Sequence, residues 1–463
     1  MYRNYKTPIT RVFPDVSIPE PRVSKFVVFL IRVLGRLYLL FFYGIARIVF
    51  RDGKLLFEAF KRALAGESRC IIAFRHPNGG EPQLLTWTFL FKLRGLAARA
   101  GVRFSRNPHA VFVYGYEVTR WGGGIARYVM PNLGAMPIHH SKMDRQGMGR
   151  IFKAIVNGPF PLALAPEGQV SYSTDTVPRL EPGVIRIGFS AAERLAGINP
   201  NCPVEILPLS VYFRFGPWGK LSLEVLLRKL EKYSGLRGRG RRKLPLLERI
   251  RQCREHILEV NERRYQLESD TSLPFEERLD KVITAALETA ERMMGLKSEG
   301  EHFSRMYRIR QYCWDKIFLP EQESLDGMSP IERNAKDLEA GEAWYIGRHQ
   351  EIVDFCWYFR MPLPTNETAF HNTIEYVQNL WDFASRTMGG QYADRISIFP
   401  RRVIIQPSPV INLSERLPSY KEDKSAAINT AMSDLEKAFL DCINDANKKE
   451  GDYASSRQSV PTG

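Results

Sequence analysis

A histidine and a glutamate lie five positions apart in the segment Phe74-Arg-His76-Pro-Asn-Gly-Gly-Glu81-Pro82. The proline and two glycines between them predict a tight turn, and Pro82 suits the first turn of a following helix. Glu81 would lie near that helix start and could fold back towards the His76 ring. A carboxylate on one imidazole nitrogen leaves the other nitrogen to accept a proton. The segment predicts a general base with its orienting carboxylate, although a lone histidine is more often structural.

Two further segments contain residues that could bind a substrate. Pro166-Glu167-Gly168 follows a predicted strand, where Glu167 either grips a substrate hydroxyl or caps a turn. An apolar stretch that begins at Gly134 leads into a basic cluster, which predicts either a phosphate site or a solvated helix start. The polar members of that cluster are His139, His140, Lys142, Arg145 and Arg150. Adjacent histidines point apart on a helix or strand, so they are a poor indication of a metal site.

Residues 69–213 alternate short apolar runs with helical patterns. This alternation predicts an α/β core with a largely parallel sheet. The expected strands are Cys70–Phe74, Ala110–Tyr114, Phe160–Ala165 and Ile206–Phe213. The expected helices are Glu81–Arg99, Gly147–Asn157 and Pro182–Ala196. In a sheet of this kind, His76 and Glu167 would each follow the end of a strand.

The most apolar stretch is Lys25–Phe50, which still contains Arg32, Arg36 and Arg47. Its uncharged run is much shorter than the roughly 20 residues that a membrane span needs. Arginines between aromatic and aliphatic residues are typical of a helix that lies in the headgroup plane of a membrane. The alternative is a buried amphipathic helix of the globular body. The Pro-rich segment before it, up to Arg22, does not have the pattern of a signal peptide.

The rest of the chain is expected to add a helical part and a closing element. Residues 236–395 look like a mainly helical insertion or second domain, joined through the basic tract 237–243. A strand is expected at 401–411, a helix at 426–447 and a disordered tail at 448–463. These boundaries leave an N-terminal segment, 1–60, and a core, 61–235.

Charge is unevenly distributed along the 463 residues. The first 250 residues hold 39 of the 66 Lys+Arg but only 16 of the 51 Asp+Glu, so the net charge of +15 comes from this half. A basic half favours an anionic partner such as a membrane surface, a phosphorylated substrate or a nucleic acid. The six cysteines form no CxxC pair and are expected to be isolated thiols, with neither a disulfide framework nor a zinc site.

Taken together and in this order, the segments resemble the glycerolipid acyltransferase family, which includes bacterial 1-acylglycerol-3-phosphate acyltransferases. That family is marked by HxxxxD, a glycine-led loop ending in arginine, a PEG turn and a final apolar strand with proline. The corresponding segments here are His76…Glu81, Gly134…His140, Pro166-Glu167-Gly168 and Ile206–Ser210. Tyr116-Glu117-Val118 and Glu181-Pro182-Gly183 are similar to weaker landmarks between them. Residues 70–215 carry most of the resemblance, and 220–395 match nothing in the family.

The sequence departs from the family pattern at three positions. Glu81 stands where the family has aspartate, His140 where it has arginine, and Gln169 where an arginine often follows the PEG turn. The two missing arginines are those that the family uses for the acceptor's phosphate. Lys142, Arg145 or Arg179 could replace them.

The resemblance implies an α/β acyltransferase-like core with N-terminal membrane-associated helices, a helical C-terminal insertion and a closing strand and helix at 396–447. It implies transfer of an acyl group from acyl-CoA or acyl-carrier protein to the hydroxyl of 1-acylglycerol 3-phosphate, without a metal or bound cofactor. His76 would be the base and Glu81 its orienting group. The expected substrate-binding residues are Gly134, His140, Lys142, Arg145, Pro166, Glu167, Gly168 and Arg179.

The expected partners are membrane lipids and the acyl donor, at the cytoplasmic face of a membrane in peripheral or monotopic attachment. Two alternatives share this expectation: the same chemistry on a lysophospholipid or a lipid without phosphate, and an inactive lipid-binding homologue. A nucleic-acid binder is suggested by charge alone, and no nucleic-acid motif supports it.

Overall fold

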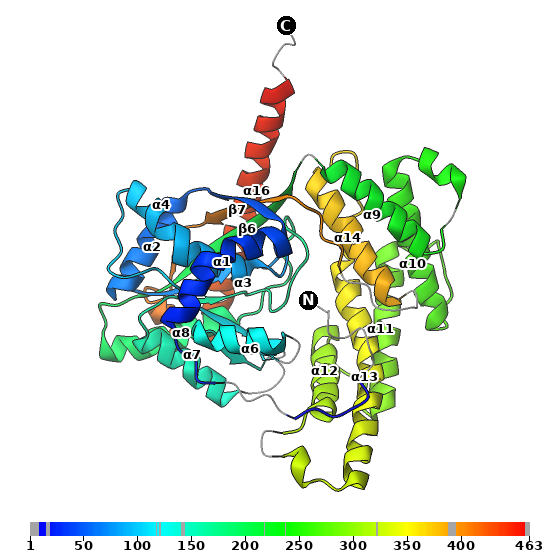
Figure 1. Ribbon diagram of the computed structural model, residues 1–463, viewed down its shortest axis with the longest axis horizontal. Coiled ribbons are helices and arrows are strands. Elements are labelled where there is room, and N and C mark those ends of the chain that lie inside the picture. Colours follow the sequence, from blue (N-terminus) through cyan, green and yellow to red (C-terminus); the bar gives the residue numbers. More distant parts are fainter. Residues whose placement is uncertain are drawn as a thin grey trace.

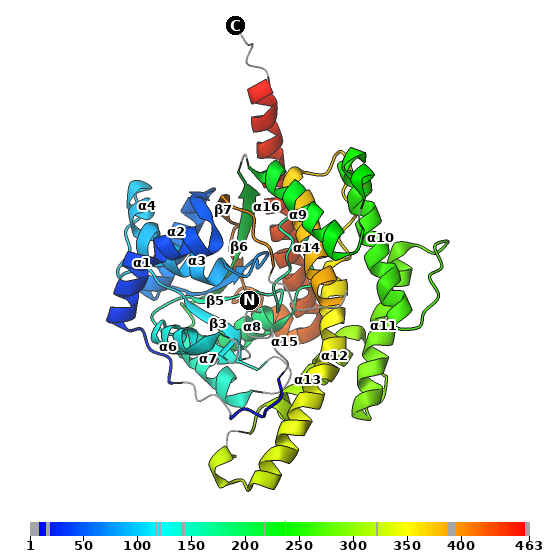
Figure 2. The same ribbon diagram turned by 45° about the vertical axis from the view of Figure 1, so that its right-hand side comes forward.

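The computed structural model describes residues 9–14, 19–116, 118–119, 122–139, 144–216, 218–236, 238–320, 323–387 and 395–458. Within them the chain folds into an α/β core and a helical part that lies beside it (Figures 1 and 2). The four strands expected in the core are present, so the α/β class predicted from the alternating pattern is confirmed.

The core contains one mixed sheet in the order β1-β7-β6-β2-β5-β3-β4, with β8 paired to β6. Neighbouring strands are parallel except where β6 meets β7 and β8, because the chain returns from the helical part in the opposite direction. The observed sheet is therefore largely parallel, as the sequence predicts, but β6 pairs antiparallel with β7 and β8. The strands are β1 (Ile45–Phe50), β2 (Arg69–Phe74), β3 (Val111–Gly115), β4 (Met136–Ile138), β5 (Leu162–Leu164), β6 (Val204–Phe215), β7 (Arg401–Pro407) and β8 (Ile411–Asn412).

Helices cover both faces of the sheet, so its central strands are buried on both sides as parallel strands require. One face packs against α1 (Lys25–Tyr43), α2 (Gly53–Ala65), α3 (Glu81–Trp87), a π-helical turn (Thr88–Leu93) and α4 (Arg94–Arg99). The other face packs against α7 (Arg145–Asn157), α8 (Gly183–Ile198), α15 (Leu417–Glu422) and α16 (Lys424–Gln458). Helix α6 (Gly123–Asn132) lies between β3 and β4 in the chain.

The helical part has a hydrophobic core of its own and is inserted between β6 and β7. It consists of α9 (Gly219–Tyr233), α10 (Leu246–Arg264), α11 (Phe275–Met294), α12 (His302–Ile317), α13 (Pro330–Tyr358) and α14 (Phe370–Thr387). Leu223, Leu226 and Leu230 of α9 belong to this core, so the insertion begins at α9 rather than at the expected residue 236.

Two other expected boundaries are corrected by the structure. Strand β1 pairs in parallel with β7, so residues 45–50 of the expected N-terminal segment are an edge strand of the core sheet. Helix α16 continues to Gln458 and projects away from the core (Figure 1), so residues 448–458 are helical rather than disordered. No glycine or proline lies between Asn447 and Glu450, so nothing in that stretch ends the helix.

Candidate active site

The His76 turn lies at the carboxyl end of β2, beside the PEG turn at the carboxyl end of β5. Strands β2 and β5 are parallel neighbours, with Ala73 opposite Leu164, so the segments that follow them emerge side by side. This edge is where open α/β sheets bind their ligands. The sheet topology therefore brings two of the expected motifs to one place, although they are about 90 residues apart in the chain.

The turn after β2 folds Glu81 back onto His76, as the sequence predicts. Gly79 has a φ of 89°, which favours glycine, and Glu81 is the first residue of α3. The Glu81 Oε2 atom lies 2.6 Å from His76 Nδ1 and accepts a hydrogen bond from the Gly79 N–H at 2.8 Å. The Glu81 side chain is fully buried and the His76 ring is 13% exposed. A glutamate is therefore long enough to orient the imidazole across this turn.

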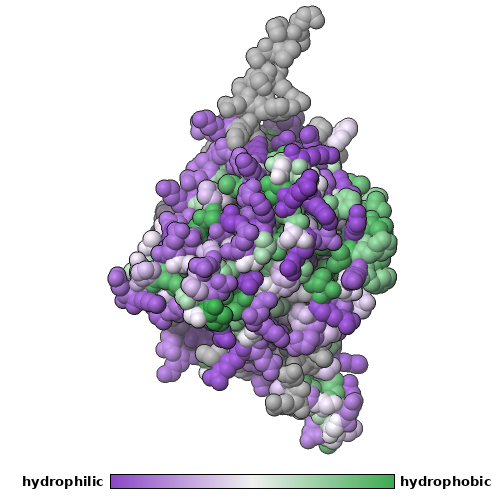
Figure 3. All heavy atoms as spheres, turned by 90° about the vertical axis from the view of Figure 1, so that its left-hand side faces the viewer, coloured by the Kyte–Doolittle hydropathy of each residue, from purple (hydrophilic) through white to green (hydrophobic). Residues whose placement is uncertain are grey.

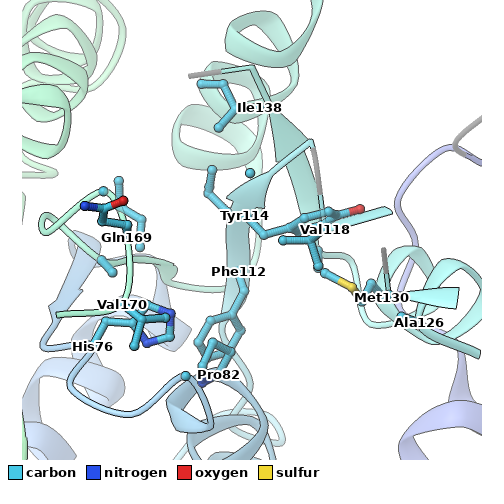
Figure 4. A pocket seen from close by; sticks show the side chains of 18 of the residues that line it. His76, Pro82, Phe112, Tyr114, Val118, Ala126, Met130, Ile138, Gln169 and Val170 are labelled. Carbon is cyan, nitrogen blue, oxygen red and sulfur yellow. The ribbon is translucent and has the colours of Figure 1, made fainter. Parts of the chain in front are cut away.

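The other ring nitrogen of His76 remains available for chemistry. With Nδ1 as the donor to Glu81, Nε2 carries the lone pair, and it forms no hydrogen bond to any residue that the structure describes. The ring lines a large cavity (Figure 4). In this tautomer Nε2 can accept a proton from a hydroxyl bound in the cavity.

Arg75, which sequence reasoning missed, fixes the backbone of this turn. Its fully buried guanidinium donates to Glu167 Oε1 at 2.5 Å and to the carbonyl oxygens of Ser173 and Thr176. The same Glu167 oxygen accepts a hydrogen bond from the His76 N–H at 3.2 Å, and the His76 carbonyl accepts one from the Ser171 N–H at 3.0 Å. The available signal was an arginine directly after the apolar run Cys70–Phe74.

Glu167 thus occupies a position between the two turns rather than in the cavity beside His76. Its carboxylate is buried against Arg75, and the residue does not line that cavity, whereas its neighbours Pro166 and Gly168 do. Gly168 has a φ of 68°, and a Cβ there would lie 2.4 Å from a Glu181 carboxylate oxygen. The turn is therefore closed by Glu181, whose N–H also donates to the Pro166 carbonyl at 2.6 Å.

Of the other expected substrate-binding residues, the three that the structure describes do not gather around His76. Gly134, with a φ of 74°, forms a turn after α6 and donates its N–H to the Arg22 carbonyl. Arg145 begins α7 and is exposed, away from the cavity. Arg179 forms an exposed ion pair with Glu301. His140 and Lys142 lie outside the described residues.

The cavity that contains His76 has a volume of about 1570 Å³ and two different walls. It exceeds the roughly 300–1,000 Å³ of an ordinary small-molecule pocket, so it has room for two substrates. One wall is apolar, and Figure 4 shows its side chains around His76. This apolar wall consists of residues from α1, β3 and α6, among them Leu34, Phe42, Phe112, Tyr114, Ile125 and Met130.

The second wall comes from the helical part and the segment that follows it, and it combines charged residues with apolar ones such as Trp314, Phe318 and Trp344. Each of its four arginines lies against a carboxylate, which limits the net charge of the wall. The pairs are Arg310 with Asp354, Arg348 and Arg386 with Glu351, and Arg395 with Asp382. A substrate with a long apolar chain and a polar end matches a cavity of this kind better than a wholly polar metabolite does.

Comparison with known proteins adds no family assignment. No protein-family model matches the chain, and no curated protein sequence matches it.

Proposed function

We propose that the protein is an acyltransferase that moves a fatty acyl group from a thioester to a hydroxyl of a lipid. The observation that carries the proposal is the His76–Glu81 pair at the edge of a large, half-apolar cavity. The resemblance of the motifs to those of glycerolipid acyltransferases supports the same chemistry. No side-chain nucleophile is required, because the acceptor hydroxyl itself attacks.

In the proposed reaction, the acceptor oxygen attacks the carbonyl carbon of the thioester while its proton passes to His76 Nε2. A C–O bond forms and the C–S bond then breaks, and the proton is returned to the departing sulfur. Glu81 holds the ring with Nε2 towards the cavity and stabilises the positive charge that the imidazole gains. General-base catalysis of this kind contributes about 10²–10⁴ in rate.

Backbone N–H groups beside His76 are suited to the negative charge that develops on the thioester oxygen. Gln169 and Val170 follow the PEG turn and line the cavity near His76 (Figure 4). Their N–H groups donate to no acceptor among the residues that the structure describes. Preorganised donors of this type stabilise an oxyanion by about 3–4 kcal/mol each.

Helix α1 supports attachment to a membrane. It is long and apolar enough to cross one, by length and composition, and most of it is exposed. Phe26, Phe29, Phe41 and Phe42 are each about 60% exposed or more. Figure 3 shows hydrophobic residues gathered along the right-hand edge of the face that it presents. Arg32 on this apolar helix favours a position in the interface of a cytoplasmic leaflet, from which lipids enter the cavity, whereas Arg36 donates to the Ile45 and Ala46 carbonyls.

The test is thioester-dependent acylation of a panel of lipid hydroxyls by the purified protein. The panel contains 1-acylglycerol 3-phosphate, the favoured acceptor, with lysophospholipids and 1-acylglycerol as alternatives. Acyl-CoA and acyl-carrier protein are offered in turn as donors. Turnover of any member supports acyl transfer and identifies the acceptor. Binding of lipid without turnover across the panel would instead mean an inactive lipid-binding homologue.

A further inference from the structure

Arg401 is a buried arginine at the beginning of β7 whose side chain reaches the His76 turn. It is 3% exposed, yet it lines the same cavity as His76. Its Nη1 donates to Asn78 Oδ1 at 2.8 Å and its Nε donates to the Ile398 carbonyl at 2.9 Å. Asn78 lies two residues after His76, so the guanidinium is positioned by the catalytic turn itself.

Arg401 differs from the other buried or half-buried arginines of the cavity wall because it forms no ion pair within the described residues. Arg310, Arg348, Arg386 and Arg395 each lie against a carboxylate. The two carboxylates that influence Arg401 most are engaged elsewhere: Glu81 with His76, and Glu375 with Thr174. Phe213 and Phe399 lie beside the guanidinium, with ring centroids 5.9 and 5.4 Å away.

A buried charge without a counter-ion is unfavourable, so its retention calls for a reason. Burial, with the nearby Arg395, lowers the pKa of Arg401 to about 10. The guanidinium nevertheless stays charged at neutral pH and faces a space large enough for a substrate. A guanidinium binds phosphate through several hydrogen bonds at once, more strongly than an ammonium group does.

We propose that Arg401 binds a phosphate group of a substrate beside His76. This inference rests on the proposed acyl transfer and adds a residue from β7 that none of the recognised motifs contains. Arg401 also provides a binding site for the phosphate, which Arg145 and Arg179 do not provide because neither lines the cavity. The phosphate belongs either to the acceptor or to the phosphopantetheine part of the donor, and the experiment separates these two sources.

The first measurement is the binding of 1-acylglycerol 3-phosphate and of 1-acylglycerol with the same chain, by calorimetry in detergent. We expect Arg401→Gln to weaken binding of the phosphate-bearing lipid about 10- to 100-fold and to leave the phosphate-free lipid within about threefold, since hydrogen bonds to charged groups are worth this much. Arg401→Lys should weaken binding of the phosphate-bearing lipid less than Arg401→Gln does. Arg402→Gln is the matched control, because the next residue of the strand faces the opposite side of the sheet.

The second measurement is acyl transfer with matched substrates. Each acceptor of the pair is assayed with acyl-CoA and with an acyl-pantetheine thioester that has no phosphate. If the KM of Arg401→Gln rises only for phosphate-bearing acceptors, the bound phosphate belongs to the acceptor. If it rises only for acyl-CoA, the bound phosphate belongs to the donor. Asn78→Ala removes the contact between Arg401 and the turn but keeps the guanidinium charge. This variant should therefore still distinguish phosphate-bearing from phosphate-free substrates.

Two results would overturn the proposal. In the first, Arg401→Gln weakens all lipids and donors equally, which is the behaviour of a residue that only holds the turn. In the second, the folded variant binds every phosphate-bearing substrate as the wild type does. If the wild-type protein binds the phosphate-bearing lipid through Arg401 but transfers no acyl group, the anion site stands and the proposed acyl transfer fails.

Discussion

At the scale of single residues, the site depends on how the His76 ring is held. Glu81 contacts Nδ1, and the backbone of His76 is fixed on both sides by Glu167 and Ser171. The turn therefore sets the direction of Nε2 before any substrate binds. Preorganisation of this kind is what a general base requires, because a misplacement of about 1 Å can cost about a hundredfold in rate.

The role of Glu81 is tested by two substitutions that change different properties. Glu81→Gln keeps the size but removes the charge that stabilises the imidazolium, so kcat should fall about 100-fold or more. Glu81→Asp keeps the charge and shortens the side chain in a turn fitted to glutamate, so a loss of about 10- to 100-fold is expected. Equal rates for Glu81→Gln and wild type, measured as initial rates of acyl transfer, would reduce Glu81 to a helix-start residue.

The His76–Glu81 contact was predictable from sequence, whereas its supports were not. The pair is local, and Pro77, Gly79, Gly80 and Pro82 specify the turn and the helix start that bring it together. The contact of Arg75 with Glu167 joins residues 92 positions apart, and that of Arg401 with Asn78 joins residues 323 positions apart. Only the strand order puts them side by side, and no local pattern encodes it. For the same reason Arg145 and Arg179, chosen as nearby cations, do not line the cavity.

At the scale of elements, helix α1 is packed directly against the His76 turn. A Cβ on Gly80 would lie 2.5 Å from the Tyr43 ring, and one on Gly35 would lie 2.4 Å from the Trp87 ring. These two glycines let α1 approach the start and end of α3. A helix that carries exposed apolar residues therefore contacts the turn that orients His76.

Gly80→Ala tests this contact without straining the backbone. Gly80 has a φ of −101°, which alanine adopts readily, and the nearest atoms that a Cβ would meet belong to the Tyr43 ring. We expect a fall in acyl-transfer rate of about tenfold or more, because α1 or the turn must shift. Gly95→Ala in α4 is the control, since a Cβ there meets nothing within 4 Å. Wild-type rates for both variants would show that the turn does not depend on α1.

Attachment of α1 to a membrane is tested by the double variant Phe29→Ser, Phe41→Ser. These side chains are 59% and 71% exposed and do not line the cavity. Each phenylalanine buried in the interface contributes about 2 kcal/mol, so partitioning onto anionic vesicles should fall at least about tenfold in a sedimentation assay. The matched control is Ile331→Ser, Leu338→Ser on α13, which are also highly exposed. If both variants sediment alike, α1 is not the attachment site.

At the scale of the whole molecule, the segment 171–176 joins the core to the helical part. Glu375 of α14 accepts hydrogen bonds from the N–H and hydroxyl of Thr174, and His371 of the same helix lies 2.8 Å from Asp175. Asn447 of α16 also donates to Asp175, at 3.0 Å. The mainly helical character of residues 236–395 was predicted from the sequence, but this docking was not, because it depends on tertiary contacts far apart in the chain.

Asp175 should make the junction sensitive to acid. Burial alone would raise its pKa, but the hydrogen bond and charge of His371, with the charge of Arg214, lower it overall. A carboxyl whose pKa is lowered by folding stabilises the protein above its usual pKa of about 3.9 and loses that contribution as the pH falls further. Asp175→Asn should therefore destabilise the protein by about 3 kcal/mol at pH 7 and by less at pH 3.

This expectation is checked by urea unfolding at both values of pH. Asp441→Asn is the control, because Asp441 is exposed on α16. A loss of stability in Asp175→Asn that is the same at pH 7 and pH 3 would mean that the ionised carboxylate is not what holds the junction.

The measurement that bears most directly on the proposed function is the rate of acyl transfer by His76→Ala. The substrates are the thioester and lipid that the wild-type protein uses best, and the control is His256→Ala, a half-buried histidine on α10 that does not line the cavity. We expect His76→Ala to lose about 10²–10⁴ in kcat, with unchanged unfolding and lipid binding, while His256→Ala keeps the wild-type rate. A folded His76→Ala protein that transfers acyl groups at the wild-type rate would contradict the mechanism.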